Sequence, residues 1–184
     1  FRSRGTMGSN TQASAVNVGT GVTLTSTTGV NLGGANGQGA LAGNLNINGG
    51  TAVLAAASFL DGSDSGITLS GGGTLTMGGD ITGTSGTLTL GEGTLNSSAA
   101  WTTSVGVALN AASGKTATVD TTGGDITLNG AFTGSGNLLK TGTGTLSIGA
   151  ASAGYTGTVT LASGTLSFQD TADGYKARSE EHTS

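Results

Sequence analysis

Hydrophobic and polar residues alternate in short stretches along most of this chain. Eight three-residue units place a small or polar residue between two apolar residues. This period of two is typical of β-strands with one buried face, and no stretch has the three- and four-residue spacing of an amphipathic helix. The units begin at Val22, Leu45, Ile67, Leu88, Val107, Ile126, Leu146 and Leu166.

The units follow one another at intervals of about 20 residues, and an internal repeat of that length is typical of a solenoid. A second series keeps the same interval, at Val30, Val53, Leu75, Leu95, Val119, Leu138 and Val159. We therefore predict an all-β fold, a parallel β-helix of about seven rungs with two columns of strands and a period near 20–22 residues. Parallel crossovers are almost always right-handed, so we expect a right-handed coil.

The composition fits a narrow core that is repeated many times. The 184 residues include 37 Gly and no Pro or Cys, with 9% charged and 4% aromatic residues. Glycine adopts positive φ without steric cost, as tight corners require, and proline would remove a donor from a strand paired on both sides. Gly-Thr-Leu recurs at Gly73, Gly86, Gly93, Gly144 and Gly164, and we expect each to be a corner with positive φ that leads into a strand.

The two ends of the chain differ from its body. We expect residues 1–15 to be a truncated N-terminal segment without a signal peptide, 16–170 to form the β-helix, and 171–184 to be a disordered tail. Residues 178–184 read RSEEHTS, which resembles the translation of a sequencing-adapter oligonucleotide and is expected to be an artefact. The only histidine, His182, lies there. No run of 18 apolar residues predicts a membrane-spanning helix.

The segment from Gly134 to Phe168 resembles the autotransporter-associated β-strand repeat. Twelve of its residues occupy positions of the family pattern, which is rich in Gly-x-Gly and Gly-x-Leu and includes one Lys and one Tyr-x-Gly turn. They are Gly134, Gly136, Leu138, Lys140, Gly142, Gly144, Leu146, Ile148, Tyr155, Gly157, Gly164 and Leu166. From about Val22 to Gly130 the resemblance extends only to the period and the Gly-Thr-Leu corners.

The resemblance implies a fragment of a type V secretion passenger, displayed at the bacterial cell surface and exported through its own outer-membrane barrel domain. It also implies that the C-terminal rungs fold first outside the cell and template the next ones. We therefore expect a structural stalk rather than an enzyme, without membrane insertion of this segment. One alternative is an adhesin module that binds host matrix or glycans. A less favoured one is a polysaccharide-cleaving β-helix enzyme.

Acidic residues are the first candidates for chemistry. Asp80 and Asp125 both lie in Gly-Gly-Asp-Ile-Thr, and glycan cleavage needs two carboxyl groups about 5–9.5 Å apart. We expect instead that each side chain bonds backbone amides at a Gly-rich corner, and that the two lie at different points of their rungs. We do not expect them to converge with Glu92 and Asp120, and we predict no catalytic residue.

Cofactor and nucleic-acid sites are not expected. The stretch Asp61–Ser65 has calcium-type side chains, but an EF-hand starting there would need a Glu where Gly72 stands, so no metal site is predicted. Scattered Gly-x-Gly pairs have no Walker lysine or dinucleotide-binding context. Lys115 and Lys140 are the only basic residues between Arg4 and Lys176, and the net charge is −4, which argues against nucleic-acid binding.

Two further surface features bear on ligand binding. The middle residues of the eight units form a predicted outward column that can match ice or glycans but more simply suits an exposed strand. The aromatic residues Trp101, Phe132 and Tyr155 are far apart in the sequence and predict core corners rather than a sugar-stacking platform. The column consists of Thr23, Asn46, Thr68, Thr89, Ala108, Thr127, Ser147 and Ser167.

Overall fold

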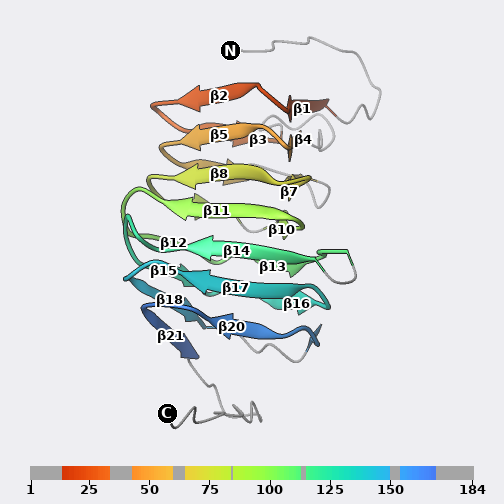
Figure 1. The fold of residues 1–184 in the computed structure, drawn as a ribbon. Coiled ribbons are helices and arrows are strands. Elements are labelled where there is room, and N and C mark those ends of the chain that lie inside the picture. Colours follow the sequence, from red (N-terminus) through yellow and green to blue (C-terminus); the bar gives the residue numbers. More distant parts are fainter. Residues whose placement is uncertain are drawn as a thin grey trace, which may run out of the picture.

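The chain forms a parallel β-solenoid (Figure 1). The computed structural model describes residues 14–33, 43–59, 65–83, 85–112, 115–149 and 154–168. All the regular secondary structure in these ranges is β-strand, and it is arranged as three seven-stranded sheets in which neighbouring strands run parallel. None of the described residues belongs to a helix that is long and apolar enough to span a bilayer. The predicted all-β parallel solenoid is confirmed.

Each coil contributes one strand to each sheet, in the order A, B, C. Sheet A contains β1 (Ser14–Gly19), β4 (Gly43–Asn48), β7 (Gly66–Ser70), β10 (Thr87–Leu90), β13 (Gly106–Leu109), β16 (Phe132–Gly134) and β19 (Gly154–Tyr155). Sheet B contains β2 (Thr23–Ser26), β5 (Thr51–Leu54), β8 (Gly73–Met77), β11 (Gly93–Ser97), β14 (Thr116–Asp120), β17 (Asn137–Thr141) and β20 (Val159–Leu161). Sheet C contains β3 (Val30–Leu32), β6 (Ala57–Phe59), β9 (Ile81–Thr82), β12 (Trp101–Thr103), β15 (Ile126–Leu128), β18 (Thr145–Ile148) and β21 (Thr165–Phe168).

The prediction of two strand columns is wrong, because the coil has three sheets. The first predicted column follows sheet A from Leu45 to Val107, but its next member, Ile126, lies in sheet C. The strand that pairs with β13 is β16, through Val107 opposite Phe132. The second predicted column is more accurate, since its members lie in sheet B from Val53 onward, but Val53 itself points outward and Ala52 is the residue opposite Leu75.

Unequal connections explain this error. β10 ends at Leu90 and β11 begins at Gly93, whereas β13 ends at Leu109 and β14 begins only at Thr116. The longer connection shifts the later strands several residues further along the sequence. A strand of sheet C therefore lies where a regular 20-residue interval predicts a strand of sheet A. Alternation identifies inward residues but does not say to which sheet they belong.

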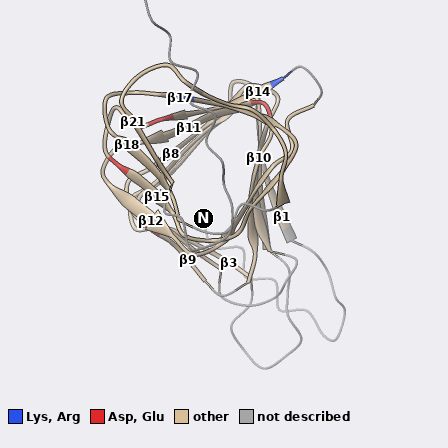
Figure 2. Ribbon diagram, turned by 90° about the horizontal axis from the view of Figure 1, so that it is seen from below, with Lys and Arg blue, Asp and Glu red and all other residues tan. Residues whose placement is uncertain are grey.

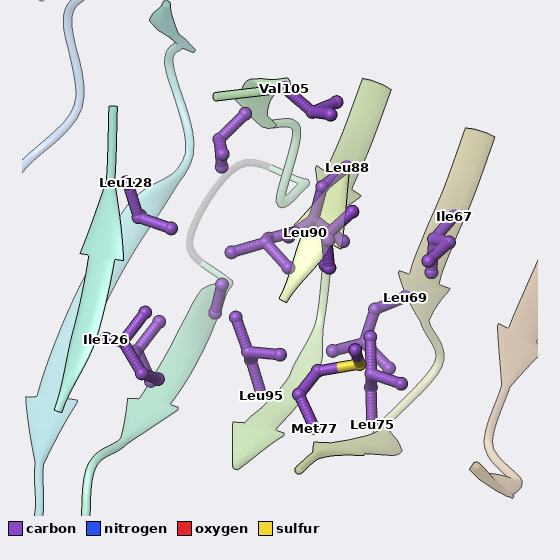
Figure 3. Close-up of a cluster of buried hydrophobic side chains, with 14 of the residues drawn as sticks. Ile67, Leu69, Leu75, Met77, Leu88, Leu90, Leu95, Val105, Ile126 and Leu128 are labelled. Carbon is purple, nitrogen blue, oxygen red and sulfur yellow. The ribbon is translucent and has the colours of Figure 1, made fainter. Parts of the chain in front are cut away.

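The inward residues of the three sheets fill one continuous core (Figure 3). Ile67, Leu88 and Val107 are directly opposite one another on successive strands of sheet A, and all are buried. Leu75 and Leu95 of sheet B and Ile126 of sheet C complete the core from the other sides. Burying each such side chain contributes about 1.5–3 kcal/mol, so apolar stacking between coils is the main stabilising interaction.

The Gly-Thr-Leu glycines have two different structural roles. Gly86, Gly93 and Gly164 have positive φ, as predicted. Gly73 and Gly144 do not, so the prediction is wrong for these two. A Cβ at Gly73 would approach the carbonyl oxygen of Ile47 to 2.9 Å, and one at Gly144 would lie 2.6 Å from that of Thr121. Close packing of consecutive coils, rather than turn geometry, therefore requires glycine at both positions.

Candidate functional site

The structure gives Asp80 and Asp125 the same role. Each immediately precedes a strand of sheet C, β9 and β15 respectively, and its Oδ1 accepts a hydrogen bond from a backbone amide of the next coil. The donors are the amides of Thr102, at 2.8 Å, and Thr145, at 2.7 Å. The predicted bonding to backbone amides is confirmed. The prediction that the two lie at different points of their coils is also confirmed, because Ile81 lies opposite Thr103 whereas Ile126 lies opposite Trp101, which offsets the two aspartates by two residues along sheet C.

A fully buried lysine occupies the corner between sheets B and C. Lys140 lies two residues after the buried Leu138 in β17, so the alternation turns both side chains inward. Its Nζ donates hydrogen bonds to the carbonyl oxygens of Thr141 at 2.7 Å, Gly142 at 3.0 Å and Ser163 at 3.1 Å. All three donor positions of the ammonium group are used, which makes its burial tolerable.

Burial and the neighbouring carboxylates shift the pKa of Lys140 in opposite directions. Burial lowers the pKa of Lys140, and the carboxylates of Asp120 and Asp125 counteract that shift. Asp120 accepts hydrogen bonds from the hydroxyl of Thr122 at 2.6 Å and from its amide at 2.8 Å. These bonds, with a smaller contribution from Lys140, lower the pKa of Asp120. Lys140 is thus the centre of a polar corner that joins successive coils.

This corner was not predicted from the sequence, in which Lys140 is notable only as one of few basic residues and as one position of the family pattern. The available signal was its place in the alternation, since Leu138 and Lys140 are two residues apart and must face the same side of their strand. The converging carbonyl groups come from two coils, and no sequence pattern shows them.

The remaining acidic candidate, Glu92, has a surface partner. Its carboxylate lies 3.5 Å from Nζ of Lys115, and the Lys115 side chain is largely exposed. In the described ranges, no three His, Cys, Asp or Glu residues are grouped closely enough to hold a metal ion. The coloured segments of Figure 2 show how sparse the charged residues are around the coil. A hydrogen bond or ion pair within the chain thus engages each of the four acidic candidates, Asp80, Glu92, Asp120 and Asp125.

The calcium-type stretch lies mostly outside the described residues. Asp61 to Asp64 are not described, whereas Ser65 is buried and its Oγ accepts a hydrogen bond from the amide of Gly43 at 3.2 Å. Ser65 therefore connects the starts of two successive strands of sheet A.

The predicted outward column is not continuous. Thr23 belongs to sheet B, Thr68 and Thr89 to sheet A, and Thr127 to sheet C. The structure instead contains an uninterrupted threonine column on the outer face of sheet B, in which each member lies opposite the next. Its members are Thr23, Thr51, Thr74, Thr94 and Thr118. In the sequence, each of these threonines directly precedes an inward residue. Only the pairing of strands between coils shows that the threonines are aligned with one another.

The aromatic residues lie in the core. Trp101, Phe132 and Tyr155 are all buried, as predicted. Phe132 and Tyr155 are in contact, with ring centroids 4.9 Å apart, and the Tyr155 hydroxyl donates to the carbonyl oxygens of Gly136 and Thr158, both at 3.0 Å. Nε1 of Trp101 is buried without a hydrogen-bond partner. These rings stabilise the coil from inside and are not available to stack on a sugar.

Comparison with protein-family models, with curated proteins and with solved structures finds no significant match to this chain. The resemblance of residues 134–168 therefore rests on the residues themselves. Several of them have defined structural roles: Gly134 and Gly142 have positive φ, Lys140 is buried, and the Tyr155 hydroxyl bonds two carbonyl groups.

Proposed function

We propose that this chain is a structural stalk within the secreted or surface-displayed passenger of a bacterial autotransporter, with no catalytic activity of its own. The observation that carries the proposal is the unbroken parallel pairing of seven strands in each of three sheets around one apolar core. The twelve matching positions between Gly134 and Leu166 connect this shape to the passenger family. The finer geometry that we propose is a right-handed coil of about seven turns.

Rigidity follows from the way in which the coils are joined. Every inner strand is hydrogen-bonded to two neighbours, and the apolar residues stack from coil to coil, so bending the rod strains several contacts at once. The side chains of Asp80 and Asp125 and the ammonium group of Lys140 add hydrogen bonds between coils. Such a rod holds whatever lies beyond it at a constant distance from its anchor.

The same geometry supports a role in export. In a linear stack each new coil needs only the previous coil as a template, so folding can propagate from one end. We propose that the C-terminal coils fold first on the cell surface after passage through an outer-membrane barrel, which is the main expected partner. Folding outside the cell then favours continued outward movement of the chain.

The proposal is tested by fusing the 184-residue chain between a signal peptide and an autotransporter barrel. Surface display is measured by protease accessibility on intact cells, relative to total fusion protein. We expect the unchanged chain to be displayed. Leu138→Asp, in a C-terminal coil, is expected to reduce display at least about tenfold, because an unpaired buried carboxylate prevents that coil from forming.

The matched control is Leu45→Asp in β4, a comparably buried residue of an N-terminal coil. This variant leaves the C-terminal coils intact, so display is expected to fall much less. Equal loss in both variants, or failure of the unchanged chain to reach the surface, would contradict the proposed role in export.

The threonine column of sheet B favours a second function, that of an adhesin module for host matrix or glycans. Hydroxyl groups repeated at the coil spacing of about 4.8 Å present a regular array of donors and acceptors. Binding to glycan and matrix arrays is the test of this function. The function is supported if the double variant Thr74→Ala/Thr94→Ala loses binding while the control on sheet A, Thr68→Ala/Thr89→Ala, keeps it. Equal binding by both double variants would exclude the column as its site.

A further inference from the structure

Lys140 interrupts an apolar column on the inner face of sheet B. One residue from each coil belongs to this column, and each lies opposite the next: Leu24, Ala52, Leu75, Leu95, Val119, Lys140 and Leu161. Lys140 is fully buried, and every other member is apolar. Apolar packing would accept a leucine at this position, so the lysine needs another explanation.

Apolar stacking alone does not fix how the last described coil pairs with the coil before it. In the observed register, Val159 of β20 lies opposite Leu138 of β17 (Figure 1). Leu161 lies opposite Lys140. A slip of two residues would keep every side chain on its own face, because the side-chain period of a strand is two. Such a slip would place Leu161 over Leu138 and exchange a leucine–lysine contact for an apolar one.

The connections between strands also permit this slip. β19 and β20 are joined by residues 156–158, whereas the equivalent connection from β13 to β14 comprises residues 110–115. Two further residues can therefore be accommodated between sheets A and B. β20 and β21 would slide together, and β21 would keep its inward face for the same reason as β20.

We propose that Lys140 fixes the register in which the last described coil pairs with the coil before it. Its Nζ bonds the carbonyl oxygens of Thr141 and Gly142 in its own coil. The third acceptor, the carbonyl oxygen of Ser163 at 3.1 Å, belongs to the next coil. A two-residue slip moves that carbonyl group by about 6.6 Å, beyond hydrogen-bonding distance. The ammonium group would then be buried with an unused donor, which is costly.

The corner around the ammonium group also belongs to the observed register. A Cβ at Gly164 would collide with the carbonyl oxygen of Gly142 and lie 2.9 Å from Nζ of Lys140, so the occupied corner accepts only glycine. Leu166 would take this position after the slip. A connection between sheets B and C needs no glycine elsewhere, since residues 98–100, between β11 and β12, contain none. The compact corner is thus tied to the lysine.

Two neutral contacts also hold this coil, at the other end of β20. The Tyr155 hydroxyl donates to the carbonyl oxygens of Gly136 and Thr158. Oδ1 of Asn137 accepts a hydrogen bond from the Thr158 amide at the surface. Hydrogen bonds to charged groups contribute more than those between neutral groups, so Lys140 is the dominant contact that selects the register. Because each coil is the template for the next, one misaligned coil would pass its error along the stack.

The test uses cysteine pairs on the outer face of sheet B, since the 184-residue chain contains no cysteine. The first pair, Leu139→Cys/Thr160→Cys, reports the observed register, because these two residues lie opposite each other. The second pair, Leu139→Cys/Ala162→Cys, reports the slipped register. Neighbouring strands are about 4.8 Å apart, within disulfide range, whereas an offset of two residues places the Cα atoms more than about 7 Å apart.

Each pair is introduced into the parent chain and into Lys140→Met, which keeps most of the side-chain volume but has no ammonium group. The chains are unfolded in denaturant, refolded under reducing conditions and then oxidised, and peptide mapping by mass spectrometry measures the yield of each disulfide. In the parent, the first disulfide is expected to exceed the second at least about tenfold. In Lys140→Met, the yield of the second is expected to rise at least about fivefold.

The matched controls are Leu138→Met and Tyr155→Phe. The first alters a buried side chain of the same strand without touching the ammonium group, and the second removes only a neutral hydroxyl. Both are expected to keep the register of the parent. Circular dichroism verifies folding, and Lys140→Leu replaces Lys140→Met if the latter does not fold, because leucine fills the same column at Leu75 and Leu95.

Three results would overturn the proposal. One is that removing the lysine does not raise the yield of the second disulfide. Another is that either control raises it as much as the loss of the lysine does. The third is that the parent chain already forms both disulfides equally, which would mean that its register is not fixed.

Discussion

At the scale of single residues, Lys140 shows most clearly how an unfavourable group is accommodated. A buried charge is costly unless hydrogen bonds satisfy it, and three carbonyl groups from two coils do so here. Leu161, the residue opposite Lys140 on β20, is apolar, so the lysine occupies a position that an apolar residue also fills. The corner carbonyl groups are what make lysine suitable.

We expect Lys140→Ala to lower the free energy of unfolding by about 2–5 kcal/mol, as for other large-to-small core substitutions. The loss combines a cavity with three carbonyl groups deprived of a donor. Lys140→Met keeps most of the volume and should lose less. Denaturant unfolding of both variants measures the difference. Equal stability of Lys140→Ala and the parent would show that this corner contributes nothing.

The stability of the chain should also depend on pH through Lys140. Its pKa is lowered from 10.5 in the folded state, so the unfolded chain binds the proton more tightly. The unfolding free energy should therefore rise with pH between the folded pKa and 10.5, and be unaffected by this group below that window. Comparing the parent with Lys140→Met over this range isolates the effect. A flat difference between the two chains would contradict it.

At the scale of elements, the corners decide how closely one coil approaches the next. Gly142 and Gly72 have similar backbone angles, with φ of +80° and +75°. A Cβ at Gly142 would collide with the amide nitrogen of Thr122 in the previous coil, whereas a Cβ at Gly72 would meet no atom within 4 Å. The pair separates the conformational role of glycine from its packing role.

Gly72→Ala is expected to cost about 1–2 kcal/mol, because only the left-handed backbone conformation is penalised. Gly142→Ala pays the same cost and adds about 1–3 kcal/mol for displacing the neighbouring coil. Thermal or denaturant unfolding of the two variants gives the difference directly. If both variants lose the same amount, the close approach at Gly142 is unimportant for stability.

At the scale of the whole molecule, the solenoid is a one-dimensional stack, so its stability should vary along the axis. Inner coils are covered on both sides, whereas the first and last are covered on one side among the described residues. Local opening should therefore be easiest at the ends. This gradient belongs to the assembly of coils rather than to any one of them.

Hydrogen exchange measures this gradient. Amides of the central strands β8, β11 and β14 are expected to exchange at least about tenfold more slowly than those of β2 and β20. Uniform exchange along the axis would contradict the picture of a stack that frays from its ends.

The sequence by itself determined the all-β class, the parallel solenoid and most of the inward residues, because alternation and a repeat of about 20 residues are properties of local chemistry. It also indicated that Asp80 and Asp125 bond backbone amides. Only the tertiary structure decided that there are three sheets, that both aspartates have one role, that the threonines of sheet B are aligned, and that Lys140 is enclosed by carbonyl groups. Each of these depends on which residue of one coil lies opposite which residue of the next, and variable connections between strands conceal that register in the sequence.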